Sequence, residues 1–243
     1  MKLYKRCKNS GVVFDSYLYA SCIIACARAV EFAQARQLHK DATDRGLALT
    51  NSVVCAVISM YGRSSELAQA ISIFDNAINN PAVKSDIMVW TALASAYGHN
   101  GDGKAAIQLL QRMDANGVKP DGVFFTSLLD ACSHAGMPQQ ALMILEQMEK
   151  KYEISPSPQH YSCVIDGFGR KGDLEKAKSL TEKLVENEKL VPLMSLLSSS
   201  RLHKNLAIAE FAYNELRIMD KLSAPSCILI YLCTIKHPQN FIF

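Results

Sequence analysis

The sequence of 243 residues lacks the patterns of the common catalytic and metal sites. It contains no Cys-x-x-Cys pair, no His-x-Glu sequence, no Walker-type phosphate loop and no Gly-x-Ser-x-Gly elbow. Zinc-deaminase, P-loop and serine-hydrolase chemistry therefore have no candidate residues. The histidines stand at no ligand spacing: His39, His99, His134, His160, His203 and His237. We expect no catalytic residue, no metal site and no cofactor.

The sequence also lacks a strong charge bias and a long apolar run. It has 26 Lys and Arg against 23 Asp and Glu, so its net charge of +3 is only a weak indication of a polyanionic partner. The apolar stretch at residues 227–233 is too short to cross a bilayer, and Lys236 follows it closely. Residues 1–10 are basic but have neither an apolar signal core nor the length of a transit peptide. We expect no membrane partner, and no transit peptide is evident.

Eight cysteines are present, and several lie within apolar helical patterns. These are Cys22, Cys26, Cys55, Cys132 and Cys163. Since none forms a metal-binding pair, we interpret them as reduced, buried small hydrophobic residues of an intracellular protein. Hydrophobic residues make up 49% of the chain, which is enough for a substantial core.

A repeat of 35 or 36 residues runs through most of the sequence. It is marked by the alanines Ala35, Ala70, Ala106, Ala141 and Ala177, and by Ala209 after a shorter gap of 32. Around them, apolar residues recur at helical spacing in two segments per unit, as in Trp90, Leu93, Ala94 and Tyr97. Turn sequences such as residues 100–103 separate the segments. A two-helix unit cannot bury its apolar stripe alone, so neighbours must stack. We predict an all-α fold, a right-handed α-solenoid of helix-turn-helix repeats.

The period and the strings that end each unit resemble those of pentatricopeptide repeats. Residues 116–121, Asn-Gly-Val-Lys-Pro-Asp, are similar to the end of such a unit, whereas tetratricopeptide repeats have a period of about 34. The alternation of unit types resembles the plant PLS subclass. The resemblance implies five units, 16–50, 51–86, 87–121, 122–157 and 158–189.

Segments outside the five units are similar to other parts of that subclass or diverge from it. Residues 1–15 resemble a lead-in from a preceding repeat, residues 190–225 resemble an E-type helical hairpin, and residues 226–243 lose the pattern. A few extra residues stand near Asn79 to Lys84 in the second unit. We expect a shortened gene product or a fragment, with upstream repeats and a targeting segment missing.

In this family each unit contacts one nucleotide of single-stranded RNA, which is read by the fifth residue of the first helix and the last residue of the unit. The resemblance implies the pairs Ala20 with Thr50, Cys55 with Asp86, Thr91 with Asp121, Thr126 with Ser157, and Ser162 with Lys189. Only Thr91 with Asp121 fits the usual code, for guanine, because a carboxylate accepts from the N–H edge of that base. Asp121 is equally suited to capping the helix that follows it.

By the same resemblance, the second residue of each unit stacks on a base. Tyr17, Met88 and Val123 suit this role, whereas Ser52 and Gln159 do not. A base stacked on such a side chain contributes on the order of 1–3 kcal/mol, so three platforms predict modest, salt-dependent affinity.

The resemblance implies a non-enzymatic RNA-binding factor in organelle RNA processing. Its expected task is recognition of C-to-U editing sites, with an editing deaminase or another organellar RNA-processing protein as partner, in mitochondria or alternatively in chloroplasts. Two alternatives stay open. One is a peptide-binding scaffold like the tetratricopeptide proteins, and the other is a truncated fragment without function.

Overall fold

A computed structural model describes residues 14–219, and every regular element in that range is helical. The lead-in up to residue 13, residues 220–225 of the E-like hairpin and the tail 226–243 lie outside the described residues. The chain divides into two compact units, residues 1–131 and 132–243, and each is described by itself. Among the described helices, none has the length and apolar character needed to cross a membrane.

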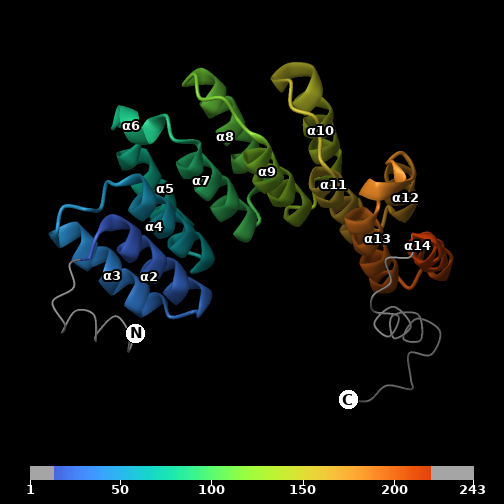
Figure 1. The fold of residues 1–243 in the computed structure, drawn as a ribbon, viewed down its shortest axis with the longest axis horizontal. Helices are drawn as coiled ribbons and strands as arrows, with labels where there is room; N and C mark the ends of the chain where they lie inside the picture. The colour runs from blue at the N-terminus through green and yellow to red at the C-terminus, as the bar shows by residue number, and fades with distance from the viewer. Residues whose placement is uncertain (1–13, 220–243) are drawn as a thin grey trace, which may run out of the picture. The chain divides into compact units, whose positions relative to one another are not determined.

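The first unit is a series of helical hairpins (Figure 1). Its helices are α2 (Ser16–Arg28), α3 (Phe32–Asp44), α4 (Asn51–Arg63), α5 (Leu67–Ala77), α6 (Pro81–Lys84), α7 (Ile87–His99), α8 (Gly103–Ala115) and most of α9 (Gly122–His134). α2 packs on α3, α4 on α5 and α7 on α8, while the first helices α2, α4 and α7 pack side by side in chain order. This is the stacked arrangement that the repeat predicts.

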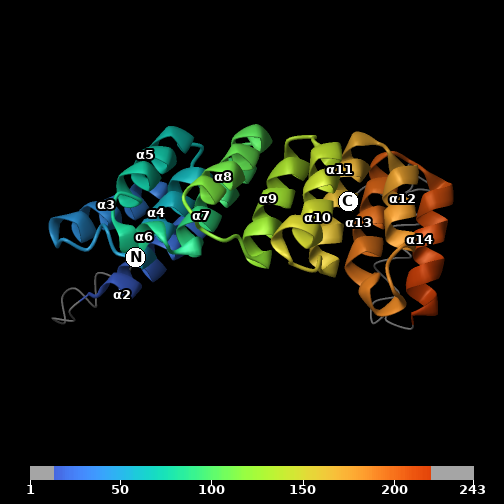
Figure 2. The same cartoon turned by 90° about the horizontal axis from the view of Figure 1, so that it is seen from above.

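The second unit continues the same construction. Besides the end of α9 it contains α10 (Pro138–Tyr152), α11 (Pro158–Lys171), α12 (Leu174–Glu182), a 3₁₀ turn (Glu186–Glu188), α13 (Leu190–Leu202) and α14 (Leu206–Ile218). α11 packs on α12 and α13 on α14, and the first helices α11 and α13 lie against each other (Figure 2). The predicted all-α solenoid fold of paired helices is confirmed. The assignment of individual units as long, short, standard or E-like stays a prediction.

The repeated alanines are the points where the second helices enter the core. All six, from Ala35 to Ala209, have no exposed surface. A methyl group at this position allows the paired helices to approach closely, and larger neighbours such as Phe74 and Leu38 fill the space around it. The turns between helices use a left-handed residue, with φ of +70° at Gly101 and +85° at Gly172, which glycine adopts without strain.

A second set of small residues sets the spacing between consecutive first helices. A Cβ added to Gly62 would lie 2.6 Å from the Cβ of Ala96, and one added to Gly98 would lie 3.3 Å from Ala131. The same contact recurs in the second unit, where Gly167 lies against Ser133 and Gly169 against Ser199. In each case the twelfth residue of the first helix of one hairpin contacts the tenth residue of the first helix of the next hairpin. Small side chains at these two positions therefore hold successive hairpins in one register.

The extra residues of the second repeat form the short helix α6. Asn80 caps it by accepting from the Ala82 N–H at 3.1 Å, and Val83 is buried. The Trp90 indole N–H donates to the Lys84 carbonyl at 2.8 Å, and the Trp90 ring meets Phe74 edge-on with centroids 4.9 Å apart. The insertion is thus fastened to α7 by a buried aromatic side chain.

Candidate nucleic-acid interface

The candidate site lies at the amino-terminal ends of the first helices, where the predicted reading and stacking residues occur. Asp86 accepts from the Met88 N–H at 2.9 Å and so caps α7, and Asp121 accepts from the Phe124 N–H at 2.7 Å at the start of α9. Ser157 and His160 form a capping box at the start of α11. The capping role expected for Asp121 is therefore present, and it orients one oxygen of each carboxylate toward the helix.

The other two unit-ending residues have different partners. The Thr50 hydroxyl donates to the Leu47 carbonyl at 2.8 Å and makes no cap to α4. Lys189 forms ion pairs with Glu186 at 3.4 Å and Glu215 at 3.3 Å. Burial lowers the pKa of Lys189, but the two carboxylates together outweigh it and raise the pKa overall. Lys189 is already paired, so a base would have to compete with two carboxylates.

The fifth residues of the first helices are largely covered. Ala20, Thr91 and Ser162 are buried, whereas Cys55 and Thr126 are half-buried. The Thr91 hydroxyl donates to the Ile87 carbonyl at 3.0 Å, and the Thr126 hydroxyl donates to the Gly122 carbonyl at 2.9 Å. The Thr91 hydroxyl oxygen can still accept a hydrogen bond from a ligand.

Ser162 differs from the two threonines. Its hydroxyl lies 2.8 Å from the hydroxyl of Ser195 on α13, so it bonds to the next hairpin. Ala20 has no polar side-chain atom at all. The fifth positions of the first and fifth hairpins are thus less suited to reading a base than Thr91 and Thr126.

One predicted pair is close enough to interact electrostatically. Burial, followed by the negative charge of Asp86, raises the pKa of the Cys55 thiol to about 12. The Asn51 amide donates to the second oxygen of Asp86 at 2.6 Å, while the first oxygen caps α7. Cys55 is therefore a neutral, weak donor, and both oxygens of Asp86 already accept a hydrogen bond. Asp121 differs from Asp86, because its capping bond to α9 uses only Oδ1.

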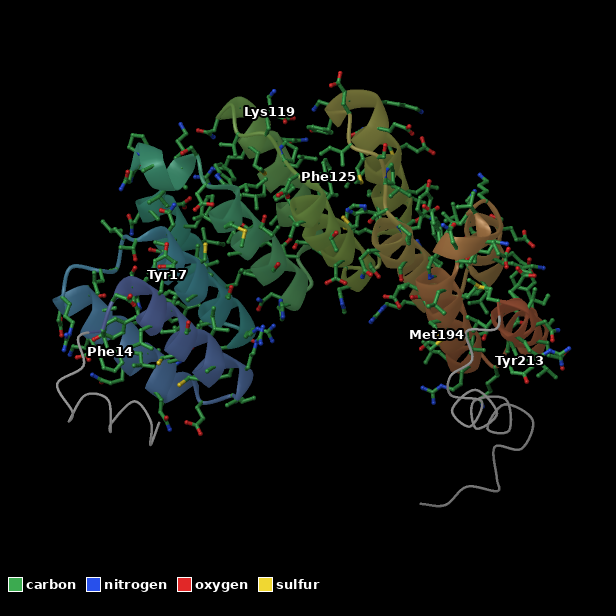
Figure 3. The ribbon with its side chains drawn as sticks, viewed as in Figure 1. Phe14, Tyr17, Lys119, Phe125, Met194 and Tyr213 are labelled. Atoms are coloured by element: carbon green, nitrogen blue, oxygen red, sulfur yellow. The ribbon has the colours of Figure 1, made fainter. Side chains whose placement is uncertain are left out.

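The predicted stacking residues are strongly exposed although they are apolar. Tyr17 on α2 is 74% exposed, Met88 on α7 57% and Val123 on α9 60% (Figure 3 labels Tyr17). All three are the second residue of the first helix of their hairpin. Exposed apolar side chains at one repeated position are available for contact with the faces of bases.

Sequence reasoning missed two residues of this kind. Val191 and Met194, the second and fifth residues of α13, are 42% and 48% exposed. The signal that could have found them is the same position count, extended from the five units into residues 190–225. In the described part of the chain, no group of three or more His, Cys, Asp and Glu side chains is placed to hold a metal ion.

Comparisons with known proteins connect this architecture to one family. The family described as "Pentacotripeptide-repeat region of PRORP" matches residues 54–193. A pentatricopeptide repeat-containing protein of Arabidopsis thaliana is 31% identical over 230 residues, which are 95% of this chain and 39% of the relative. The Arabidopsis chloroplastic protein CRR2 is 32% identical over 216 residues, 89% of this chain and 32% of the relative. A putative mitochondrial relative from Arabidopsis is 33% identical over 213 residues, 88% of this chain and 33% of its own length.

Solved structures agree in fold. The maize pentatricopeptide repeat protein PPR10 superposes with a TM-score of 0.61 at 15% identity, covering 98% of this chain and 38% of that protein. The repeat domain of Arabidopsis PRORP1, solved with tRNA, gives 0.55 at 20% identity, covering 74% of this chain and 94% of that domain. The chain spans roughly a third of the length of the curated relatives named above. Since the matching region makes up more than half of its residues, the chain belongs to the pentatricopeptide-repeat family.

Proposed function

We propose that this chain binds single-stranded RNA along the amino-terminal ends of its first helices. The observation that carries the proposal is the exposure of Tyr17, Met88 and Val123, which stand at one repeated position. Each of these side chains offers an exposed face on which a base can stack. PPR10 has been solved with an 18-nucleotide RNA element, which makes such a ligand reasonable for this fold.

Base selection in this proposal comes from the paired polar side chains, and the pair Thr91 with Asp121 reads guanine. The Thr91 hydroxyl oxygen accepts a hydrogen bond, and the Asp121 oxygen that does not cap α9 accepts from the N–H edge of the base. Thr126 and Ser157 are a second pair of hydroxyl residues by their repeat positions, but the Ser157 hydroxyl is already engaged by His160. The remaining pairs, Ala20 with Thr50, Cys55 with Asp86, and Ser162 with Lys189, contribute less, because their polar atoms are absent or already bonded.

The cellular role in this proposal is organelle RNA processing, in particular recognition of C-to-U editing sites. The chain supplies binding, and a deaminase or another RNA-processing protein supplies the chemistry in trans, recruited through residues 190–225. Relatives whose names include "mitochondrial" and "chloroplastic" favour an organelle, and we propose the mitochondrion, with the chloroplast as the alternative.

Filter binding with random single-stranded RNA at low and at moderate salt tests this function. We expect retention at low salt that weakens as salt increases, because the neutralised phosphates release counterions. The absence of retention at low salt would overturn the proposal and favour a peptide-binding scaffold. A fully paired RNA duplex of the same length is the control and should bind more weakly, since its bases are not free to stack.

A further inference from the structure

A groove beside Asp121 has no role in the function proposed so far. Its volume is about 590 Å³, and it lies in the first unit, between α6 and the connection from α8 to α9. Lys84 and Ser85 line one side, Val118, Lys119 and Asp121 the other, and Ile87 at the start of α7 lies between them. The volume falls within the range of about 300–1,000 Å³ typical of small-molecule sites and is sufficient for one nucleotide.

Both walls of the groove are held in place by buried contacts. The Trp90 indole fixes the Lys84 carbonyl at 2.8 Å, and Val83 anchors α6 in the core. On the opposite side Val118 is 9% exposed, and its N–H bonds to the Met113 carbonyl at 3.0 Å. The groove is therefore formed by ordered backbone on both sides.

The charge of the groove is positive and unbalanced. Lys84 and Lys119 have no ion-pair partner among the described residues, and Lys119 is exposed on the connection between α8 and α9 (Figure 3). The one carboxylate in the lining is Asp121, whose Oδ1 is engaged by the start of α9. The groove is therefore lined by two ammonium groups and one carboxylate, which the start of α9 already stabilises. This balance of charge favours the binding of an anion in the groove.

We propose that this groove binds the phosphate and ribose of the RNA nucleotide that adjoins the base at Thr91 and Asp121. Lys84 and Lys119 contact the phosphates, while Pro81, Val118 and Pro120 lie against the sugar. The inference rests on the proposed RNA-binding function and adds to it a backbone site built by the inserted helix α6. Asp121 belongs to both the backbone site and the base-reading site, because it lines the groove and is one member of the reading pair.

The test compares two charge-matched variants of the whole chain. The first is Lys84→Gln with Lys119→Gln, and the second is Lys40→Gln with Lys104→Gln, at exposed lysines of the same unit that do not line the groove. Affinity for single-stranded RNA is measured over a range of salt. We expect the first variant to lower the slope of log Kd against log salt by about 1.4, at roughly 0.7 per lost phosphate contact, and the second to leave it unchanged.

A steric variant tests the groove without a change of charge. Ser85→Trp fills it, and Ser72→Trp places the same side chain on the exposed face of α5. We expect the first to weaken RNA binding at least tenfold and the second to have little effect. Folding of each variant is checked by circular dichroism.

The outcomes separate this inference from the proposed function. If the native chain binds RNA but both lysine pairs behave alike and Ser85→Trp binds normally, the groove assignment is wrong and the RNA function stands. If the native chain does not bind RNA, the proposed function fails, and the groove assignment fails with it. A titration with 5′-AMP that is abolished in the Lys84 and Lys119 variant while RNA binding is unchanged would assign the groove to a free nucleotide and overturn our proposal.

Discussion

At the scale of single residues, the structure ranks the predicted reading positions. The second residues chosen by position, Tyr17, Met88 and Val123, are all exposed, and their role as stacking platforms stays a prediction. Position counting could not show which polar atoms are already bonded, because the Ser162 bond to Ser195 and the Asn51 bond to Asp86 join residues 33 and 35 apart. Partners that distant follow only from the packing of one hairpin on the next.

The reading pair gives a prediction at this scale. Changing Thr91→Asn together with Asp121→Asn should shift the preferred base at one position of the bound RNA away from guanine, because the carboxylate acceptor becomes an amide. Asparagine caps a helix about as well as aspartate, so α9 should keep its stability. Selection of RNA from a randomised pool, followed by sequencing, measures the preference.

The matched control is Asp102→Asn, at the cap of α8, where the side chain accepts from the Ala105 N–H at 3.0 Å. This variant should leave base preference unchanged. An unchanged preference in the double variant as well would reject the assignment of Thr91 and Asp121 as a reading pair.

At the scale of helices, local periodicity predicted the two helices of each hairpin. Each second helix needs a small residue where it comes close to the first helix, and an apolar stripe beside that residue, and both recur in the sequence. Periodicity did not predict that the inserted residues near Asn79 to Lys84 would form a helix. That helix depends on Trp90, whose indole reaches back six residues to the Lys84 carbonyl. The small-residue contacts between first helices were also missed, because they join residues in different repeats.

Those contacts predict an ordering of two glycine substitutions. Alanine in place of helical glycine gains about 1 kcal/mol of intrinsic stability. At Gly62 the new methyl group would stand 2.6 Å from the Cβ of Ala96 and 2.8 Å from its Cα, so successive hairpins must separate at a cost of about 1–3 kcal/mol. At Gly98 the nearest atoms are 3.3 Å away and small shifts suffice.

We therefore expect Gly62→Ala to lower the free energy of unfolding and Gly98→Ala to leave it unchanged or slightly higher. Urea denaturation of both variants beside the native chain measures the difference. Equal effects would mean that the close approach at Gly62 does not set the spacing of these helices.

At the scale of the whole molecule, the repeat predicted the fold class, and its resemblance predicted the family. The division of the chain into two compact units was not visible in the sequence, because the boundary at residues 131 and 132 falls within α9 instead of a linker. The net charge of +3 is small for a nucleic-acid-binding protein. Stacking must therefore contribute much of the affinity if the chain binds RNA.

The most direct measurement is the affinity for single-stranded RNA of the native chain and of a variant with Tyr17, Met88 and Val123 all changed to serine. These side chains are exposed, so their removal should not disturb the core. At about 1 kcal/mol for each lost platform, affinity should fall on the order of 100-fold. A control variant with Val30, Met143 and Ile218 changed to serine, which removes equally exposed apolar side chains elsewhere, should bind like the native chain. Equal affinity of all three proteins would contradict the account.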